Sequence, residues 1–438
     1  MLLLAVPMVV EMMMESLFAV TDAFFVAKLG ADAVATVGLS ESLLTIVYTV
    51  AMGLSIAVTS TVARHVGAGD RDAAARAAVQ GIVAGLAIAI VLSALGIAYA
   101  PELLRLMGAS EAVIRTGTGF TRVLLGGEAT VILLFLINAA FRGAGDAAVA
   151  MRVLIVSNVL NIVLDPLLIF GIGPFPELGV TGAAVATTTG RGVGVLLQLW
   201  VLLRGAGRLR VRRAHLVPDG AVLRALLALA GPATLQVFIG TASWIGLTRV
   251  LAPFGSAALA GYTIGIRIVI FAILPAVGVA NAAATMVGQA LGARKPERAE
   301  QAAWLACRYN LAFLGVLGLV FVLAARPLVA VFTRDDAVAS VAVDTLRIIA
   351  AGFPFYAFGM VLTEAFNGAG DTLTPTLINL GVFWLFEIPF AWVLAVRTPL
   401  GPRGVFLAIT LAFSTLAVVS ALLFRRGGWK RAPGPAHP

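Results

Sequence analysis

Long apolar stretches separated by short polar connections run through the whole sequence. Breaking it at Gly, Pro and clustered charges leaves stretches of about 20 residues or more, the length that an α-helix needs to cross the hydrocarbon core of a bilayer. The pattern predicts an all-α polytopic membrane protein without a large soluble domain. Its twelve expected transmembrane helices lie at residues 2–27, 33–63, 77–99, 113–140, 151–171, 179–203, 223–250, 256–290, 301–324, 337–365, 375–396 and 404–424.

The second half of the sequence repeats the pattern of the first half at an offset of 225 positions. Pro7 falls on Pro232, and the loop at 141–146 falls on the loop at 366–371. Because the offset spans six crossings, an even number, both halves have the same orientation in the membrane. We therefore expect two parallel six-helix repeats around a central cleft, each with a proline that bends its first helix.

The repeat and the charges together predict the domain organisation. We expect an N-lobe at 1–203, a basic linker at 204–222, a C-lobe at 223–425 and a tail at 426–438. The linker, the tail and the connections after the second, fourth and eighth spans hold more than half of the 31 Lys and Arg residues. The positive-inside rule places these segments in the cytoplasm, so both termini are expected there, with the protein in a bacterial inner membrane.

Composition excludes several classes of function. The chain is 60% hydrophobic and 12% charged, a balance that a soluble domain does not have. Cys307 is the single cysteine and the three histidines lie in polar connections, so the sequence predicts neither a disulfide framework nor a catalytic metal site. Arginines mark the ends of apolar runs rather than alternating with exposed aromatics, so no nucleic-acid partner is expected. We expect a monomer whose partners are the bilayer and small organic molecules.

Acidic and amide side chains within the apolar spans are the candidate functional groups, because a charge at membrane depth costs at least about 2.5 kcal/mol and usually faces a cavity or a partner. In the first span, Glu11, Glu15 and Asp22 share one helix face. In the fifth span, Asn158, Asn161 and Asp165 share another. The C-lobe carries only Glu364 and Glu387 at comparable depth. The pattern favours cation chemistry in the N-lobe.

The chemistry of these groups leaves alternatives open. Oxygen donors suit a small hard cation such as Na⁺, whereas a lone buried carboxylate can take up H⁺ instead. The same groups can also simply hydrogen-bond one helix to another, at about 0.6 kcal/mol each. Glu11, Glu15, Phe18, Asn158, Glu364 and Glu387 are candidates for lining a substrate cleft.

The sequence resembles the multidrug and toxic compound extrusion (MATE) family, most closely its prokaryotic DinF-type branch, across almost its full length. The residues that carry the resemblance are Pro7, VTDAFFVAKLG at 20–30, FRGAGD at 141–146, NIVLDPLLIFG at 161–171, GAAVATT at 182–188 and FNGAGDTLTP at 366–375.

The resemblance implies a function and a site. The family's N-lobe cation site maps onto Asp22, Asn161, Asp165 and Thr187, with Thr188 as a second choice for the threonine. It implies an antiporter that exports cationic or amphipathic organic compounds in exchange for H⁺ or Na⁺, without a cofactor and with no metal beyond that Na⁺.

Two other functions remain to be weighed. A lipid-linked oligosaccharide flippase of the same superfamily would need a cationic cleft, whereas the first span here is acidic. An intramembrane enzyme would need a nucleophile with its base or a metal-binding aspartate motif. Asp335–Asp336 is the only Asp-Asp pair and lies in a connection, so no enzymatic activity is expected.

Overall fold

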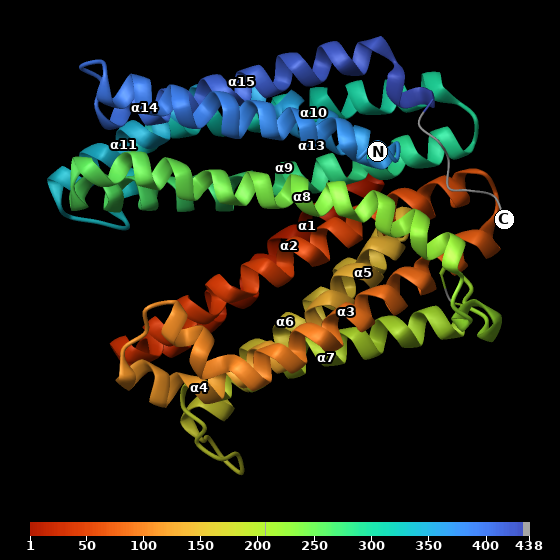
Figure 1. The fold of residues 1–438 in the computed structure, drawn as a ribbon, viewed down its shortest axis with the longest axis horizontal. Helices are drawn as coiled ribbons and strands as arrows, with labels where there is room; N and C mark the ends of the chain where they lie inside the picture. The colour runs from red at the N-terminus through yellow and green to blue at the C-terminus, as the bar shows by residue number, and fades with distance from the viewer. Residues whose placement is uncertain (206, 432–438) are drawn as a thin grey trace. The chain divides into compact units, whose positions relative to one another are not determined.

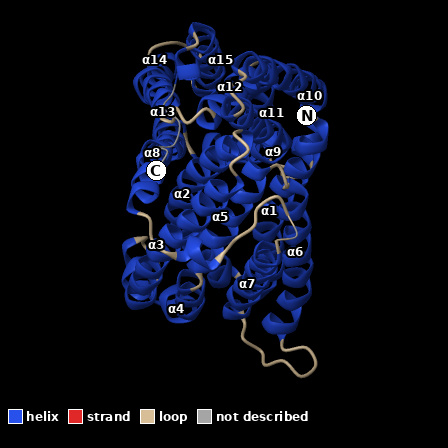
Figure 2. Cartoon of the chain, turned by 90° about the vertical axis from the view of Figure 1, so that its right-hand side faces the viewer, coloured by secondary structure: helices blue, strands red, loops and turns tan. Residues whose placement is uncertain are grey.

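The chain was analysed as a computed structural model, which describes residues 1–205 and 207–431. These residues form helices joined by short loops, and Figure 2 shows no strand among them. The first half contains α1 (Leu2–Val26), α2 (Ala31–Gly67), α3 (Arg71–Leu106), α4 (Glu111–Gly126), α5 (Glu128–Ala144), α6 (Ala147–Phe170) and α7 (Val180–Arg204). The second half contains α8 (Gly220–Leu251), α9 (Ser256–Gly292), α10 (Pro296–Ala330), α11 (Asp336–Ala351), α12 (Phe353–Gly368), α13 (Leu373–Asn379), a π-helix (Leu380–Glu387), α14 (Ile388–Val396) and α15 (Pro402–Arg426).

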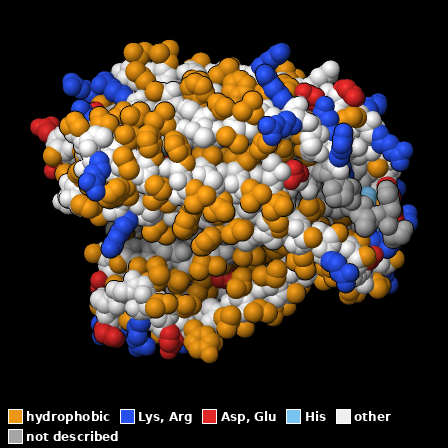
Figure 3. All heavy atoms as spheres, turned by 45° about the horizontal axis from the view of Figure 1, so that its top comes forward, with side chains coloured by type: hydrophobic (Ala, Val, Ile, Leu, Met, Phe, Trp, Pro, Cys, Tyr) orange, Lys and Arg blue, Asp and Glu red, His pale blue; other side chains and the backbone are white. Residues whose placement is uncertain are grey.

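The predicted number of membrane spans is confirmed. Within the described residues, 11 helices are long and apolar enough to cross a membrane, and the bent pair α11–α12 brings the number to 12. That pair bends by 61° at Gly352, where a single span was expected. Gly352 is the repeat equivalent of Gly127, which separates α4 from α5. Figure 3 shows hydrophobic side chains over most of the visible helix surface, with charged side chains toward the helix ends.

The described chain, drawn as a ribbon in Figure 1, divides into two compact units. Each unit has its own cluster of buried hydrophobic residues. One unit consists of Val10–Ala230, and the other of Met1–Val9 with the described part of Gly231–Gly434. The divisions fall inside α1 and α8, close to Pro7 and Pro232. The start of each half thus belongs to the unit formed by the other half, a reciprocal exchange consistent with the internal repeat.

The repeat extends to backbone geometry that the sequence pattern did not predict. Tyr99 in α3 and Ala324 in α10 are equivalent by the offset of 225, and both interrupt their helix with non-helical dihedrals. A Cβ on Gly143 would lie 2.7 Å from the Thr59 carbonyl oxygen, and one on its equivalent Gly368 would lie 2.1 Å from the Ala284 carbonyl oxygen. Both halves therefore use a glycine at the same place to bring two helices together.

The π-helix marks the point where the repeat offset changes. A Cβ on Gly182 would lie 2.4 Å from the Leu168 carbonyl oxygen, and one on Gly404 would lie 2.7 Å from the Leu394 carbonyl oxygen. Leu394 corresponds to Leu168 at an offset one larger than 225, because the wider turn of the π-helix accommodates an extra residue. With the offset of 226, Asn161 corresponds to Glu387 and Asp165 corresponds to Ala391. The offset of 225 would have paired Asp165 with Phe390.

The basic linker is held to the first unit. The buried Gln80 of α3 donates to the carbonyls of His215 and Val217, each at 2.9 Å, and accepts from the Asp219 amide. His215 also lies 3.0 Å from Asp72. Residues 213–219 are therefore anchored to α3.

Candidate functional site

The four residues of the predicted cation site lie together in the first unit. Asp22 comes from α1, Asn161 and Asp165 lie one turn apart on α6, and Thr187 lies on α7. The glycines of α7 allow this convergence, because a Cβ on Gly190 would lie 2.9 Å from the Ser157 carbonyl oxygen of α6. All four functional side chains are buried.

Hydrogen bonds connect the four side chains into one cluster. The Thr187 hydroxyl lies 2.8 and 2.9 Å from the two carboxylate oxygens of Asp22. The Asn161 amide nitrogen lies 3.1 Å from the Thr187 hydroxyl, 3.3 Å from Asp165 and 3.4 Å from Asp22. Asn161 therefore bridges the two carboxylates, and Thr187 fixes the orientation of Asp22.

Two oxygens of the cluster have no hydrogen-bond partner among the described residues. They are Oδ2 of Asp165 and Oδ1 of Asn161, both buried. A buried polar atom without a partner is costly, and two neighbouring carboxylates repel one another when both are charged. A proton or a small cation between these oxygens relieves both costs, so the donor set suits either H⁺ or Na⁺.

A cavity of about 200 Å³ in the same unit shares residues with this cluster. Asp22 and Thr187 belong to both. The Arg191 guanidinium lies 4.8 Å from the Phe18 ring centroid, and it donates to the Tyr48 hydroxyl at 2.8 Å. The wall of the cavity is made by Phe18, Asp22, Glu41, Leu44, Thr45, Tyr48, Phe120, Leu124, Thr187 and Arg191.

The two acidic residues earlier on α1 occupy different environments. Glu11 does not line this cavity; it is buried and accepts a hydrogen bond of 2.5 Å from Arg142 of α5. Glu15 is half-buried, and one of its oxygens has no hydrogen-bond partner in the part of the chain that the structure describes. Its charge interacts with Arg191 and Arg142. Each glutamate therefore has one oxygen without a hydrogen-bond partner among the described residues, but of the two only Glu15 interacts electrostatically with Arg191 of the cavity wall.

The remaining sequence candidates are distributed over both units. Phe18 lines the cavity, whereas Asn158 is buried outside it and donates to the Leu154 carbonyl at 2.9 Å. Glu364 and Glu387 belong to the other unit. Glu364 accepts from Asn367 at 3.4 Å, and Glu387 is buried at the end of the π-helix, in electrostatic range of Tyr262 and Tyr356.

Sequence reasoning missed Arg191, Tyr48 and Glu41 as residues of the site. Arg191 had a usable signal, since it follows Thr187 by four positions and so shares its helix face. Tyr48 and Glu41 of α2 had none, because only the packing of α2 against the rest of the unit brings them to the cavity.

Comparison with known proteins agrees with this arrangement. The MatE family model matches residues 7–167 and 232–393, one stretch in each half. "Probable multidrug resistance protein NorM" of Thermotoga maritima is 28% identical over 98% of this chain and 92% of its own length. "FAD transporter" of Shewanella oneidensis is 25% identical over 93% and 90%.

A solved structure shares the fold as well. "Crystal structure of MATE in the bent conformation" superposes with a TM-score of 0.91 at 26% identity, covering 98% of this chain and 95% of that one. Family match, fold and the position of the four-residue cluster lead to one conclusion: the chain belongs to the MatE family, the family that its sequence resembles.

Proposed function

We propose that this protein is a multidrug efflux antiporter, which exports cationic or amphipathic organic compounds in exchange for H⁺ or Na⁺. Membership of the MatE family makes it a transporter rather than an enzyme. The observation that carries the proposal is the double role of Asp22, which belongs to the buried oxygen cluster and also lines the cavity. A coupling cation and an organic cation therefore compete for one carboxylate.

The coupling follows from this competition. Binding of one H⁺ or Na⁺ adds a positive charge to the pair of Asp22 and Asp165, which reduces the negative charge that attracts an organic cation. An ion drives transport only through a difference in its affinity for two conformations, so alternating access requires that the cluster differ between inward-facing and outward-facing states. Asp22 belongs to α1 and Asp165 to α6, so a movement between these two helices changes that affinity.

The alternative function, a lipid-linked oligosaccharide flippase, has less support. The cavity wall contains two carboxylates, Asp22 and Glu41, against the single guanidinium of Arg191. A pyrophosphate-bearing lipid would meet net negative charge there. The Shewanella relative is named for FAD, itself a pyrophosphate, so FAD is the informative anionic compound to include in a transport assay.

The test is transport by the purified protein in proteoliposomes with imposed H⁺ or Na⁺ gradients. Asp22→Asn and Asp165→Asn should each abolish gradient-driven efflux of organic cations while the protein still elutes as one folded species. Asp70→Asn is the matched control, because Asp70 caps α3 by accepting from the Ala73 amide and Asn caps a helix equally well. Full gradient-driven transport by Asp165→Asn would falsify the assignment, and faster export of FAD than of cations would favour an anion transporter.

We also propose a monomer in the inner membrane with both termini in the cytoplasm. The topology is tested by single cysteines in a Cys307→Ala background, which suits the buried apolar surroundings of Cys307. Ala214 and Ala293 are exposed in the segments assigned to the cytoplasm, and Ala337 is exposed at the opposite helix ends. Cysteines at the first two positions should react only from the cytoplasmic side, and a cysteine at Ala337 only from outside; the reverse pattern would overturn the orientation.

A further inference from the structure

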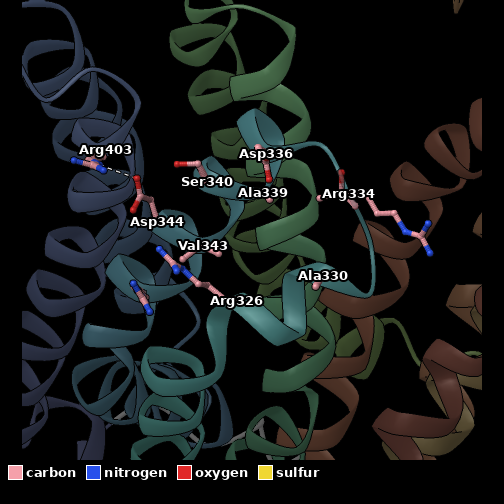
Figure 4. A pocket seen from close by; sticks show the side chains of 11 residues that line it. Arg326, Ala330, Arg334, Asp336, Ala339, Ser340, Val343, Asp344 and Arg403 are labelled. Carbon is pink, nitrogen blue, oxygen red and sulfur yellow. Dashed lines mark hydrogen bonds and ion pairs between the residues drawn. The ribbon is translucent and has the colours of Figure 1, made fainter.

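A second pocket lies in the unit that contains α9 to α15. It is at the C-terminal end of α10, opposite the end that follows the basic loop. It has a volume of about 900 Å³ and lies between the end of α10, α11 and the start of α15 (Figure 4). α10 has 35 residues and is therefore about 50 Å long, more than the roughly 30 Å of a hydrocarbon core. The pocket is consequently at a boundary between membrane and water.

Arginines dominate the wall of this pocket. Four of its residues are Arg326, Arg334, Arg347 and Arg403, against two aspartates, Asp336 and Asp344. The positive-inside rule predicts few basic residues at this end of the helices in the proposed orientation, so four in one pocket need a separate explanation.

The arginines are only partly neutralised. Arg403 lies 2.7 Å from Asp344, and Arg347 donates to the Val322 carbonyl at 3.2 Å. Figure 4 shows the contact between Arg403 and Asp344, with Arg326 on the other side of Asp344. Among the described residues, Arg326 and Arg334 have no carboxylate within ion-pair distance, so the pocket keeps net positive charge.

Apolar side chains surround the same helix end. Leu323, Val331 and Phe332 are exposed near the end of α10. Basic residues around a headgroup-sized pocket, with apolar side chains beside it, match a ligand that has an anionic head and hydrocarbon chains.

We propose that this arginine pocket binds the headgroup of an anionic phospholipid, with the acyl chains along the exposed end of α10. Arg326 and Arg347 supply charge to the phosphodiester, while Asp344 restrains Arg403. The internal repeat offers a natural comparison. At the equivalent end of the first half, Arg347 corresponds to the exposed Arg122, but Arg326 corresponds to Pro101 and Arg334 to Ala109.

The experiment is a native mass spectrometry titration of the purified full chain with phosphatidylglycerol and phosphatidylcholine. Wild type should retain one phosphatidylglycerol in preference to phosphatidylcholine. Arg326→Gln/Arg347→Gln should weaken that binding about 25-fold, or about fivefold for each basic residue near a headgroup. Arg122→Gln, the matched control, should leave it unchanged.

A gain-of-binding variant separates lost charge from lost folding. Asp344→Asn frees Arg403 and should tighten phosphatidylglycerol binding several-fold, an effect that misfolding does not produce. Equal retention of both lipids by wild type, or equal binding of phosphatidylglycerol by wild type and the double variant, would overturn the proposal. Binding of glycerol phosphate as tightly as phosphatidylglycerol would also overturn it, since the ligand would then be a soluble phosphate.

Discussion

Thr187 contacts both carboxylate oxygens of Asp22, at 2.8 and 2.9 Å, and so joins α7 to α1 through one side chain. The contact fixes the rotamer of an acid that also lines the cavity. In the proposed mechanism, the strength of this contact therefore affects whether Asp22 binds the coupling cation or the substrate.

Replacing Thr187 by Val removes the hydroxyl with little change in volume. A hydrogen bond to a charged group is worth about 1.5–3 kcal/mol, so the affinity of the cluster for its coupling cation should change by about tenfold or more. Losing a donor to the ionised Asp22 carboxylate should strengthen H⁺ binding, whereas losing a hydroxyl oxygen that could coordinate Na⁺ should weaken Na⁺ binding. The measurement is the concentration of H⁺ or Na⁺ that half-saturates efflux in proteoliposomes. Thr187→Ser should restore the wild-type value; if Val behaves like wild type, Thr187 does not belong to the coupling site.

The choice between Thr187 and Thr188 shows what sequence can and cannot supply. The motif located the threonine to within one residue, and the geometry selects Thr187, because Thr188 lies beside Gly127 instead. The carboxylates and amides were predictable because charges at membrane depth are rare. The shared helix face of the acidic residues on α1 was predictable. The sequence did not indicate that Glu11 forms an ion pair with Arg142 whereas Glu15 forms none at salt-bridge distance within the described residues.

The fold was predictable for a related reason. Span length and the repeated loops located the helix ends to within seven residues, since a bilayer requires continuous apolar helices. The π-helix was not predictable, because a single extra residue leaves the apolar pattern of that span unchanged. The anchoring of the linker depended on Gln80, a polar residue on α3 with no motif around it.

Close helix packing at equivalent glycines gives a stability prediction. Gly143→Ala and Gly368→Ala each place a Cβ against a backbone carbonyl, which cannot move as a flexible side chain can, so each should cost about 1–3 kcal/mol. Gly315→Ala, inside α10 with open space around it, is the control and should be neutral or stabilising by about 0.5–1 kcal/mol. Thermal unfolding in detergent measures all three, and similar melting temperatures for them would contradict the packing argument.

The linker contains a carboxylate with a predictable pH response. The amides of Val222 and Ala221, together with Arg76, hold the pKa of Asp219 below its ordinary value. A lowered folded pKa stabilises the start of α8 fully above about pH 4, and the effect is lost as pH falls through the folded pKa. Hydrogen exchange at the Val222 amide, corrected for its intrinsic pH dependence, should therefore accelerate at the acid end.

Asp219→Asn is the control for this transition, because the amide oxygen still accepts from the helix start but does not titrate. The variant should show pH-independent protection at Val222. The same acid transition in both proteins would assign it to another group.

The buried pair of Glu11 and Arg142 gives the last prediction, which separates a structural role from a substrate role. Both residues are buried, and the pair joins α1 to α5 at 2.5 Å. Removing one partner leaves an uncompensated buried charge, a loss of about 3–5 kcal/mol. Glu11→Gln and Arg142→Met should therefore each lower the melting temperature markedly, whereas the double variant should regain much of the loss because no lone charge remains.

Glu15→Gln is the matched comparison, one helical turn along the same face of α1. Because Glu15 makes no ion pair at salt-bridge distance within the described chain, its replacement should leave the melting temperature nearly unchanged and weaken efflux of organic cations more than that of neutral substrates. Measuring melting temperature and transport for all four variants decides the point. If Glu11→Gln keeps full stability but loses cation transport, Glu11 acts on the substrate, and the ion pair with Arg142 is not what holds α1 against α5.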